Sequence, residues 1–227
     1  MTSLNVNQID IERTALLFFD LIDGFYHQAE PVKKALLKPM IDNAVRLMNA
    51  GRKMKVPIFF AKGSHRADGL TASNLITDTD NALRPWPNGV VKRGLPVAID
   101  GTDASEVIPE LKPSPTDYYV PKQRWSAFHQ TYLDLALRSR SLKTVIVAGA
   151  STEIGVAATI FAGRDLDYNL IVVRDACVSA YGNESRNILM NRVFPRMCRV
   201  RTTDEVIVML SGRGQIPFEE AETTNAR

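Results

Sequence analysis

The chain has 227 residues, of which 45% are hydrophobic and 23% charged, and a formal net charge of +3 at neutral pH. These values are typical of a folded globular protein, and we expect a single domain over 1–227 with its core at about 14–210. The basic residues are spread along the chain and form no stripe, which argues against nucleic acid as a partner.

The apolar runs are short and the cysteines few. The longest runs, at 14–19 and 144–150, fall far below the ~20 residues that cross a membrane, so no membrane association is expected. The N-terminal stretch is polar and unlike a signal peptide, which favours a cytoplasmic protein. Cys177 and Cys198 adjoin strand-like segments and are predicted to be buried, reduced thiols.

In chain order, the first apolar run, at 14–20, predicts a strand buried on both faces that ends in the carboxylate of Asp20. Residues 31–53 then show helical periodicity, and 56–62 predict the next strand. The expected apolar side of this helix consists of Leu36, Met40, Ala44, Leu47 and Met48.

Residues 63–116 are rich in Gly, Pro, Asp, Ser and Asn and show no sustained period. A long irregular stretch inside a compact domain is usually functional, so we expect this one to cover the site. A short strand is predicted at 117–121 and a helix at 131–140.

The remaining segments alternate between strand and helix. Strands are predicted at 143–149 and 169–176 and near 198, and helices follow them; Ser/Thr residues begin the helix after 150, and Thr203 caps the last helix. This alternation predicts a three-layer α/β/α sandwich with a mainly parallel, roughly six-stranded sheet. Right-handed crossovers then bring Asp20 and the segments 121–128 and 149–155 to one edge of the sheet.

Asp20 and Lys122 are the candidate ionisable groups at that edge. An aspartate at a strand end more often caps a neighbouring turn, and a lone lysine is usually a solvated charge. Lys122, however, is framed by Pro121, Trp125 and Phe128, which favours partial burial. A nearby cation would lower the pKa of Asp20 and burial would raise it, and the sequence leaves this balance open.

The turn at 149–155 joins a strand to a helix and is built of small residues. Such a turn lets a ligand approach the backbone, and the N–H groups at a helix start can hold a developing oxyanion. An ordinary capped turn is the alternative interpretation.

Together these segments resemble a known family. An Asp ends the first strand; K-x-x-x-S-A-F follows at 122–128, G-x-x-T-x-x-G-V at 149–156 and D-A at 175–176. This order and spacing are similar to those of the isochorismatase-like, or cysteine hydrolase, superfamily. The resemblance spans about 14–210 and implies the same α/β/α fold.

The resemblance also implies roles. Asp20 would be the acid/base carboxylate, and Lys122 would orient it and stabilise negative charge. The backbone N–H groups of Ser151 and Gly155 would form the oxyanion site, next to a non-proline cis peptide at Ala150–Ser151. Members usually form dimers or tetramers, so the resemblance implies a homo-oligomer.

Gly155 is the main departure from the family pattern, because amidase members carry a nucleophilic cysteine there. True isochorismatases need no such nucleophile: their aspartic acid protonates the methylene carbon of a vinyl ether, and water captures the cation. Yet Ile22 replaces the usual glutamine after the first strand, and Ser151, Thr152 and Glu153 replace a Tyr-Ala-His stretch.

No catalytic metal is expected, because His27, His65 and His129 lack the clustered spacing of a metal site, and no cofactor is expected either. His27 could instead reach the site, although a surface position is commoner for such a residue. Glu153 and Arg124 adjoin the motifs and could tune substrate choice. The candidate substrate-binding aromatics are Phe25, Trp86, Trp125 and Phe128, the last with core packing as its alternative.

The leading hypothesis is an isochorismatase-family hydrolase of a small cyclic or carboxylated metabolite, with isochorismate-type vinyl-ether hydrolysis favoured. Two alternatives stay open. One is an amidohydrolase related to nicotinamidase, N-carbamoylsarcosine amidase or ureidoacrylate hydrolase; the other is a catalytically silent member that binds a small molecule.

Overall fold

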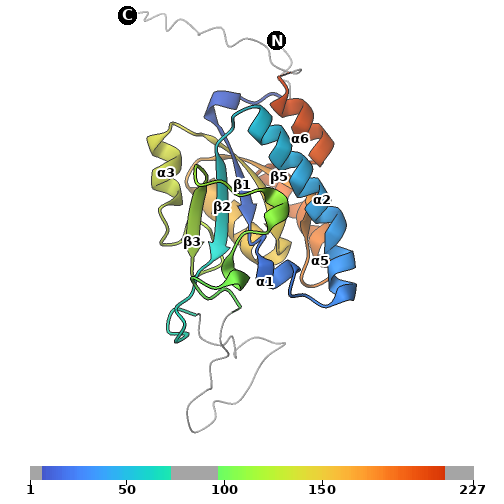
Figure 1. Ribbon diagram of the computed structural model, residues 1–227. Coiled ribbons are helices and arrows are strands. Elements are labelled where there is room, and N and C mark those ends of the chain that lie inside the picture. Colours follow the sequence, from blue (N-terminus) through green and yellow to red (C-terminus); the bar gives the residue numbers. More distant parts are fainter. Residues whose placement is uncertain (1–6, 73–96, 213–227) are drawn as a thin grey trace, which may run out of the picture.

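Six parallel strands form a single sheet in the computed structural model, which describes residues 7–72 and 97–212 (Figure 1). The order of the strands across the sheet is β3-β2-β1-β4-β5-β6. Their bounds are β1 Thr14–Phe19, β2 Ile58–Gly63, β3 Tyr118–Lys122, β4 Thr144–Ala150, β5 Asn169–Val178 and β6 Arg199–Arg201. The predicted parallel sheet of roughly six strands is therefore confirmed.

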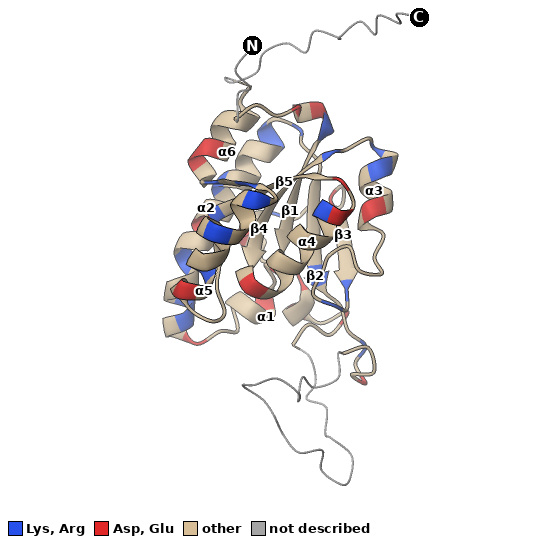
Figure 2. Ribbon diagram, turned by 180° about the vertical axis from the view of Figure 1, so that it is seen from behind, with Lys and Arg blue, Asp and Glu red and all other residues tan. Residues whose placement is uncertain are grey.

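Helices cover both faces of this sheet, as Figures 1 and 2 show from opposite sides. On one face lie α2 (Pro31–Lys53) and α6 (Thr203–Leu210), and on the other lie α3 (Leu133–Ser139) and α4 (Ala157–Asp165). Two short helices, α1 (Asp23–Tyr26) and α5 (Asn183–Ile188), follow β1 and β5. The remaining turns are 3-10 segments at Ile11–Arg13, Asp103–Ser105, Pro109–Leu111 and Phe194–Arg196, and π turns at Thr152–Val156 and Leu189–Val193.

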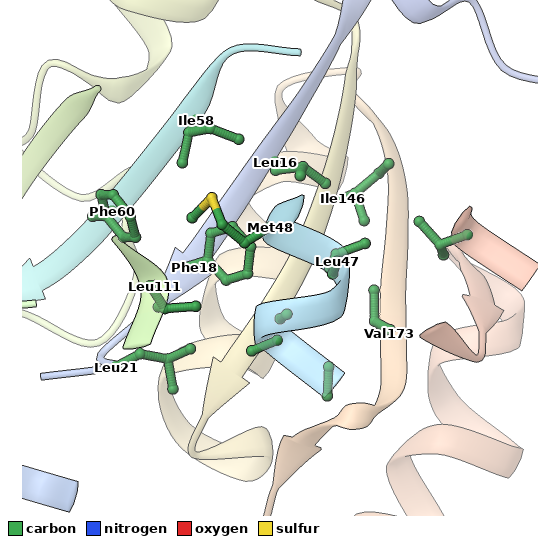
Figure 3. Packing of buried hydrophobic residues seen from close by; sticks show 14 of the residues in the cluster. Leu16, Phe18, Leu21, Leu47, Met48, Ile58, Phe60, Leu111, Ile146 and Val173 are labelled. Carbon is green, nitrogen blue, oxygen red and sulfur yellow. The ribbon is translucent and has the colours of Figure 1, made fainter. Parts of the chain in front are cut away.

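The core beneath α2 shows why this sequence forms a covered sheet. Leu47 and Met48 point from the helix at Phe18, Phe60 and Ile146 on the strands (Figure 3). All six residues of β1 are buried, as expected for a central strand with helices on both sides. Burial of such side chains is the main stabilising contribution to the fold.

The predicted apolar side of α2 is wrong at one position. Leu36 is 72% exposed, and Leu37 is buried in its place. Adjacent helical residues point about 100° apart, so the stripe that contains Leu37, Met40, Ala44 and Leu47 turns Leu36 away from the sheet. Leu36 lines a cavity at the carboxyl edge of the sheet instead.

The cap of α6 also differs from the prediction. Thr202, not Thr203, is the N-cap: its side chain accepts from the Glu205 N–H, and the Glu205 carboxylate accepts from the Thr202 N–H. Thr203 is fully buried and donates its hydroxyl to Asp175. Asp175, from the D-A pair at the end of β5, therefore anchors α6.

Charged side chains of both signs are interspersed over the helices in Figure 2. Within 7–72 and 97–212, no helix is long and apolar enough to cross a membrane.

The strands end at one edge, where β1 and β4 approach each other closely. A Cβ at Gly149 would lie 2.1 Å from the Phe19 carbonyl oxygen, and Gly149 has a φ of 134°. Only glycine tolerates both conditions. The last turns of β1 and β4 are thereby held against each other, directly before Asp20 and the 150–156 turn.

Candidate active site

Asp20 follows the last residue of β1 and is fixed by its backbone and by its side chain. Its φ of 50° lies in the left-handed region, and its N–H donates to the Ala61 carbonyl (2.8 Å). Oδ1 accepts from the Gly63 N–H at 2.9 Å, and Oδ2 accepts from Lys122 Nζ at 2.7 Å. The two candidate ionisable groups of the sequence therefore form one ion pair.

The parallel register of the sheet explains this pairing. Gly63 at the end of β2 lies opposite Lys122 at the end of β3, and β2 lies between β3 and β1. The main chain of β2 and a side chain of β3 thus reach the same carboxylate from one direction.

Burial determines the electrostatics of the pair. The side chains of Lys122 and Asp20 are 8% and 14% exposed. Burial raises the pKa of Asp20, while the Lys122 ammonium and the Gly63 N–H act in the opposite direction. Lys122 Nζ also lies 4.4 Å from the centre of the Phe19 ring, on which a cation is favourably placed.

The turn after β4 approaches the pair from the other half of the sheet. The Ala150–Ser151 peptide is cis, as the resemblance implied, and Thr152–Val156 form a π turn. Thr152 does not cap this turn; its hydroxyl donates to the Val178 carbonyl (2.9 Å) and ties the turn to the end of β5.

A buried hydrogen-bond chain links this turn to the segment that carries Lys122. The Ala127 N–H donates to Thr159 Oγ (2.9 Å), and the Thr159 hydroxyl donates to the Gly155 carbonyl (2.7 Å). Ala127 belongs to the S-A-F motif, and Thr159 lies one helical turn after Gly155. Thr159 therefore links the two sequence motifs, and this fixes the position of the turn relative to β3.

A cavity of ≈ 830 Å³ opens at this edge of the sheet. It brings together most of the residues that the sequence predicted for the site: Asp20, Phe25, Lys122, Trp125, Ser151 and Gly155. A second cavity of ≈ 530 Å³ shares Lys122 and Trp125 with it. The basic side chains of Arg124, His65 and His129 line this second cavity.

Other candidates lie elsewhere. The Phe128 ring stacks on Tyr168 at 5.5 Å and packs with the core beside α4, so it does not line the larger cavity. His27 pairs with Glu110 at 3.0 Å. Trp86 and the middle part of the irregular stretch, 73–96, lie outside the described residues.

The sequence did not indicate Phe19 as a site residue, and it named Glu153 without predicting its contacts. Phe19 lines the cavity and packs against Gly155, although its place in an apolar strand gave no sign of this. Glu153 accepts hydrogen bonds from the Ser179 hydroxyl and the Tyr181 N–H, and so organises the loop after β5 that forms another wall. Its position beside the turn motif was the only signal.

Neither cysteine is placed for nucleophilic attack in the larger cavity. Burial raises the pKa of the thiols of Cys177 and Cys198 to about 12 in each case. Both thiols are free, and neither residue lines the larger cavity. Within the described ranges, no cluster of three His, Cys, Asp or Glu residues is arranged to hold a metal ion.

Comparison with known proteins identifies the family. The isochorismatase domain matches residues 14–205. The chain belongs to the isochorismatase family. It is 30% identical to the isochorismatase family protein YwoC of Bacillus subtilis (strain 168) over 207 residues, which is 90% of this chain and 97% of YwoC.

Further relatives of this hydrolase extend the comparison. The ureidoacrylate amidohydrolase RutB of Acinetobacter baylyi is 27% identical over 183 residues, or 76% of this chain and 74% of RutB. An isochorismatase family protein from Burkholderia thailandensis has a similar solved structure, with a TM-score of 0.74 and 27% identity. That similarity covers 90% of this chain and 98% of the other.

Proposed function

We propose that this hydrolase uses Asp20 as a general acid and water as the nucleophile, on a small cyclic or carboxylated substrate. Vinyl-ether hydrolysis of the isochorismate type is the favoured reaction. One observation carries the proposal: the buried Asp20 carboxyl, held by Lys122 and Gly63, borders a cavity whose described lining includes no thiol.

The reaction starts with Asp20 protonated. Its proton adds to the terminal methylene carbon of the vinyl ether, whose electron pair forms the new C–H bond and leaves an oxocarbenium ion. Water adds to that cation and loses a proton, and the hemiketal collapses to an alcohol and a ketone. A carboxyl group with a raised pKa suits this role because it retains its proton to higher pH.

The other residues have supporting roles in this scheme. The Lys122 ammonium holds Asp20 in position and stabilises the carboxylate that remains once the proton has left. The N–H groups of Ser151 and Gly155 would bind an oxygen of the substrate. The Arg124 guanidinium in the lining of the neighbouring cavity favours an acidic substrate.

Amide hydrolysis is the second candidate, favoured by the similarity to a ureidoacrylate amidohydrolase. With glycine at position 155, water would have to attack the carbonyl carbon, and Asp20 would have to be ionised to take a proton from that water. The two candidates therefore require opposite protonation states of Asp20 at the start of the reaction.

The test is pyruvate release from isochorismate, measured beside ammonia release from ureidoacrylate and nicotinamide. Wild type and Asp20→Asn are compared, with Asp23→Asn as a matched control near the site. We expect pyruvate release that Asp20→Asn abolishes and Asp23→Asn preserves. Ammonia release without pyruvate release would replace the proposal with the second candidate, and Asp20-independent turnover would overturn both.

A further inference from the structure

Phe19 occupies the space in which a side chain at position 155 would have to lie. A Cβ at Gly155 would lie 2.0 Å from Phe19 Cε1, 2.4 Å from Cζ and 3.0 Å from Cδ1. Real Cβ atoms do not approach other heavy atoms so closely, so the ring and any side chain at 155 exclude each other. Gly155 is therefore required by its neighbour, although its φ is not in the left-handed region.

The backbone that carries the ring is held on both sides. Phe19 is fully buried, and its backbone pairs with Ala61 on one side and Gly149 on the other. The close approach of Gly149 to the Phe19 carbonyl prevents the strand from shifting toward β4. On another side the ring lies 4.4 Å below Lys122 Nζ.

We propose that Phe19 determines how this site reacts: its ring excludes any side-chain nucleophile at position 155 and leaves water as the attacking group. This inference rests on the proposed function and adds a residue to it. Asp20 is the next residue along the chain, so the acid and the group that excludes a covalent intermediate belong to one strand end. Phe19 and Gly155 then form one unit that can be changed only jointly.

Thiol reactivity tests this unit directly. The variants are Gly155→Cys alone and Gly155→Cys combined with Phe19→Val, each treated with iodoacetamide and mapped by mass spectrometry. Wild type gives the background, which is expected to be low because both native cysteines are largely buried with raised pKa values. Ile154→Cys, in the same turn and lining the same cavity, is the matched control, with and without Phe19→Val.

The expected result is alkylation of residue 155 at least tenfold faster in the double variant than in Gly155→Cys. Cysteine at 154 should react at the same rate, within about twofold, in both backgrounds. Equal rates at 155 in the two backgrounds would overturn the inference. Recovery of folding only in the double variant would support it, because the ring is the sole difference.

If the cysteine variants do not accumulate, Gly155→Ala replaces them, and the melting temperature is the measurement. Phe19→Val should then reverse part of the loss caused by Gly155→Ala, whereas additive losses would overturn the inference. None of these measurements uses a substrate, so their failure is distinguishable from a failure of the proposed reaction.

Discussion

The two halves of the carboxyl edge are built in different ways. At the ends of β1, β2 and β3, ionisable side chains dominate: Asp20 and Lys122 form a buried pair, supported by the Gly63 N–H. At the ends of β4 and β5, the cavity wall is a main-chain turn held by side chains that point away from the reacting groups, such as Thr152 and Thr159. In the proposed mechanism the first half supplies proton chemistry, and the second supplies shape and backbone donors.

Phe19 separates these halves. Its ring contacts the Lys122 ammonium on one side and the Gly155 backbone on the other. In relatives with a cysteine at this position, as the resemblance implies, both halves would contribute a reacting side chain. Under the proposed function, reactivity is concentrated in the first half of this chain's edge, so substitutions there should have the largest effects.

Asp20→Asn should cause the largest loss. Removal of a general acid typically costs about 10²–10⁴-fold in turnover. The asparagine keeps the size of the side chain, so the melting temperature should change far less than the activity. Steady-state kinetics on the proposed substrate, isochorismate, measures the effect, with Asp23→Asn expected to stay near wild type. Activity of Asp20→Asn within tenfold of wild type would show that Asp20 is not the general acid and that the reacting groups lie outside this half.

Lys122→Met should shift the pH dependence. Lys122 lowers the pKa of Asp20, so its removal raises that pKa further above the ordinary value. A reaction that needs protonated Asp20 proceeds below this pKa and is lost as the pH rises through it; the falling limb of kcat should therefore move to higher pH. Above that pKa, where Asp20 is ionised, the unpaired buried carboxylate also destabilises the protein by roughly 3–5 kcal/mol.

The matched control is Lys62→Met, since Lys62 is a buried lysine on the neighbouring strand that pairs with Glu106 and does not line the larger cavity. In Lys62→Met, the falling limb of the kcat–pH profile should stay at the same pH as in wild type. Where turnover is too slow for a pH profile, infrared detection of the protonated Asp20 carboxyl measures the pKa of Asp20 directly. A limb that moves to lower pH would show that the ionised form of Asp20 is the active one.

The sequence predicted the first half of the edge better than the second. Asp20 and Lys122 could be predicted because each follows a strand, and parallel strands bring such ends together. The contact between Phe19 and Gly155 could not, because a phenylalanine in a fully apolar strand looks like any core residue. A Ser/Thr cap was expected at the start of the helix after 150, but Thr152 binds the end of β5 instead, a long-range partner that no local pattern reveals.

Thr159→Val should weaken the link between the halves. The valine keeps the volume of the side chain but leaves the buried Ala127 N–H without its acceptor, which costs about 1–3 kcal/mol. The free energy of unfolding, from urea titration, measures this loss, and Thr159→Ser, which keeps the hydroxyl, should recover most of it. A loss in Thr159→Ser without a loss in Thr159→Val would mean that methyl packing, not the hydrogen-bond chain, holds the turn.

Glu153→Gln should have the smallest effect, confined to binding. Its carboxylate accepts from the Ser179 hydroxyl and the Tyr181 N–H, so it shapes a wall of the cavity without bordering the reacting pair. Hydrogen bonds to a charged group are roughly twice as strong as neutral ones, and their weakening loosens the loop at 179–181. KM should rise by a few fold, on the order of 1 kcal/mol in binding, while kcat stays near wild type.

The control is Glu184→Gln. Glu184 is a neighbouring charge on α5 that is exposed and does not line the cavity, so its substitution should change neither constant. A fall in kcat at unchanged KM would instead place Glu153 in the chemistry and end the distinction between a reactive half and a shaping half.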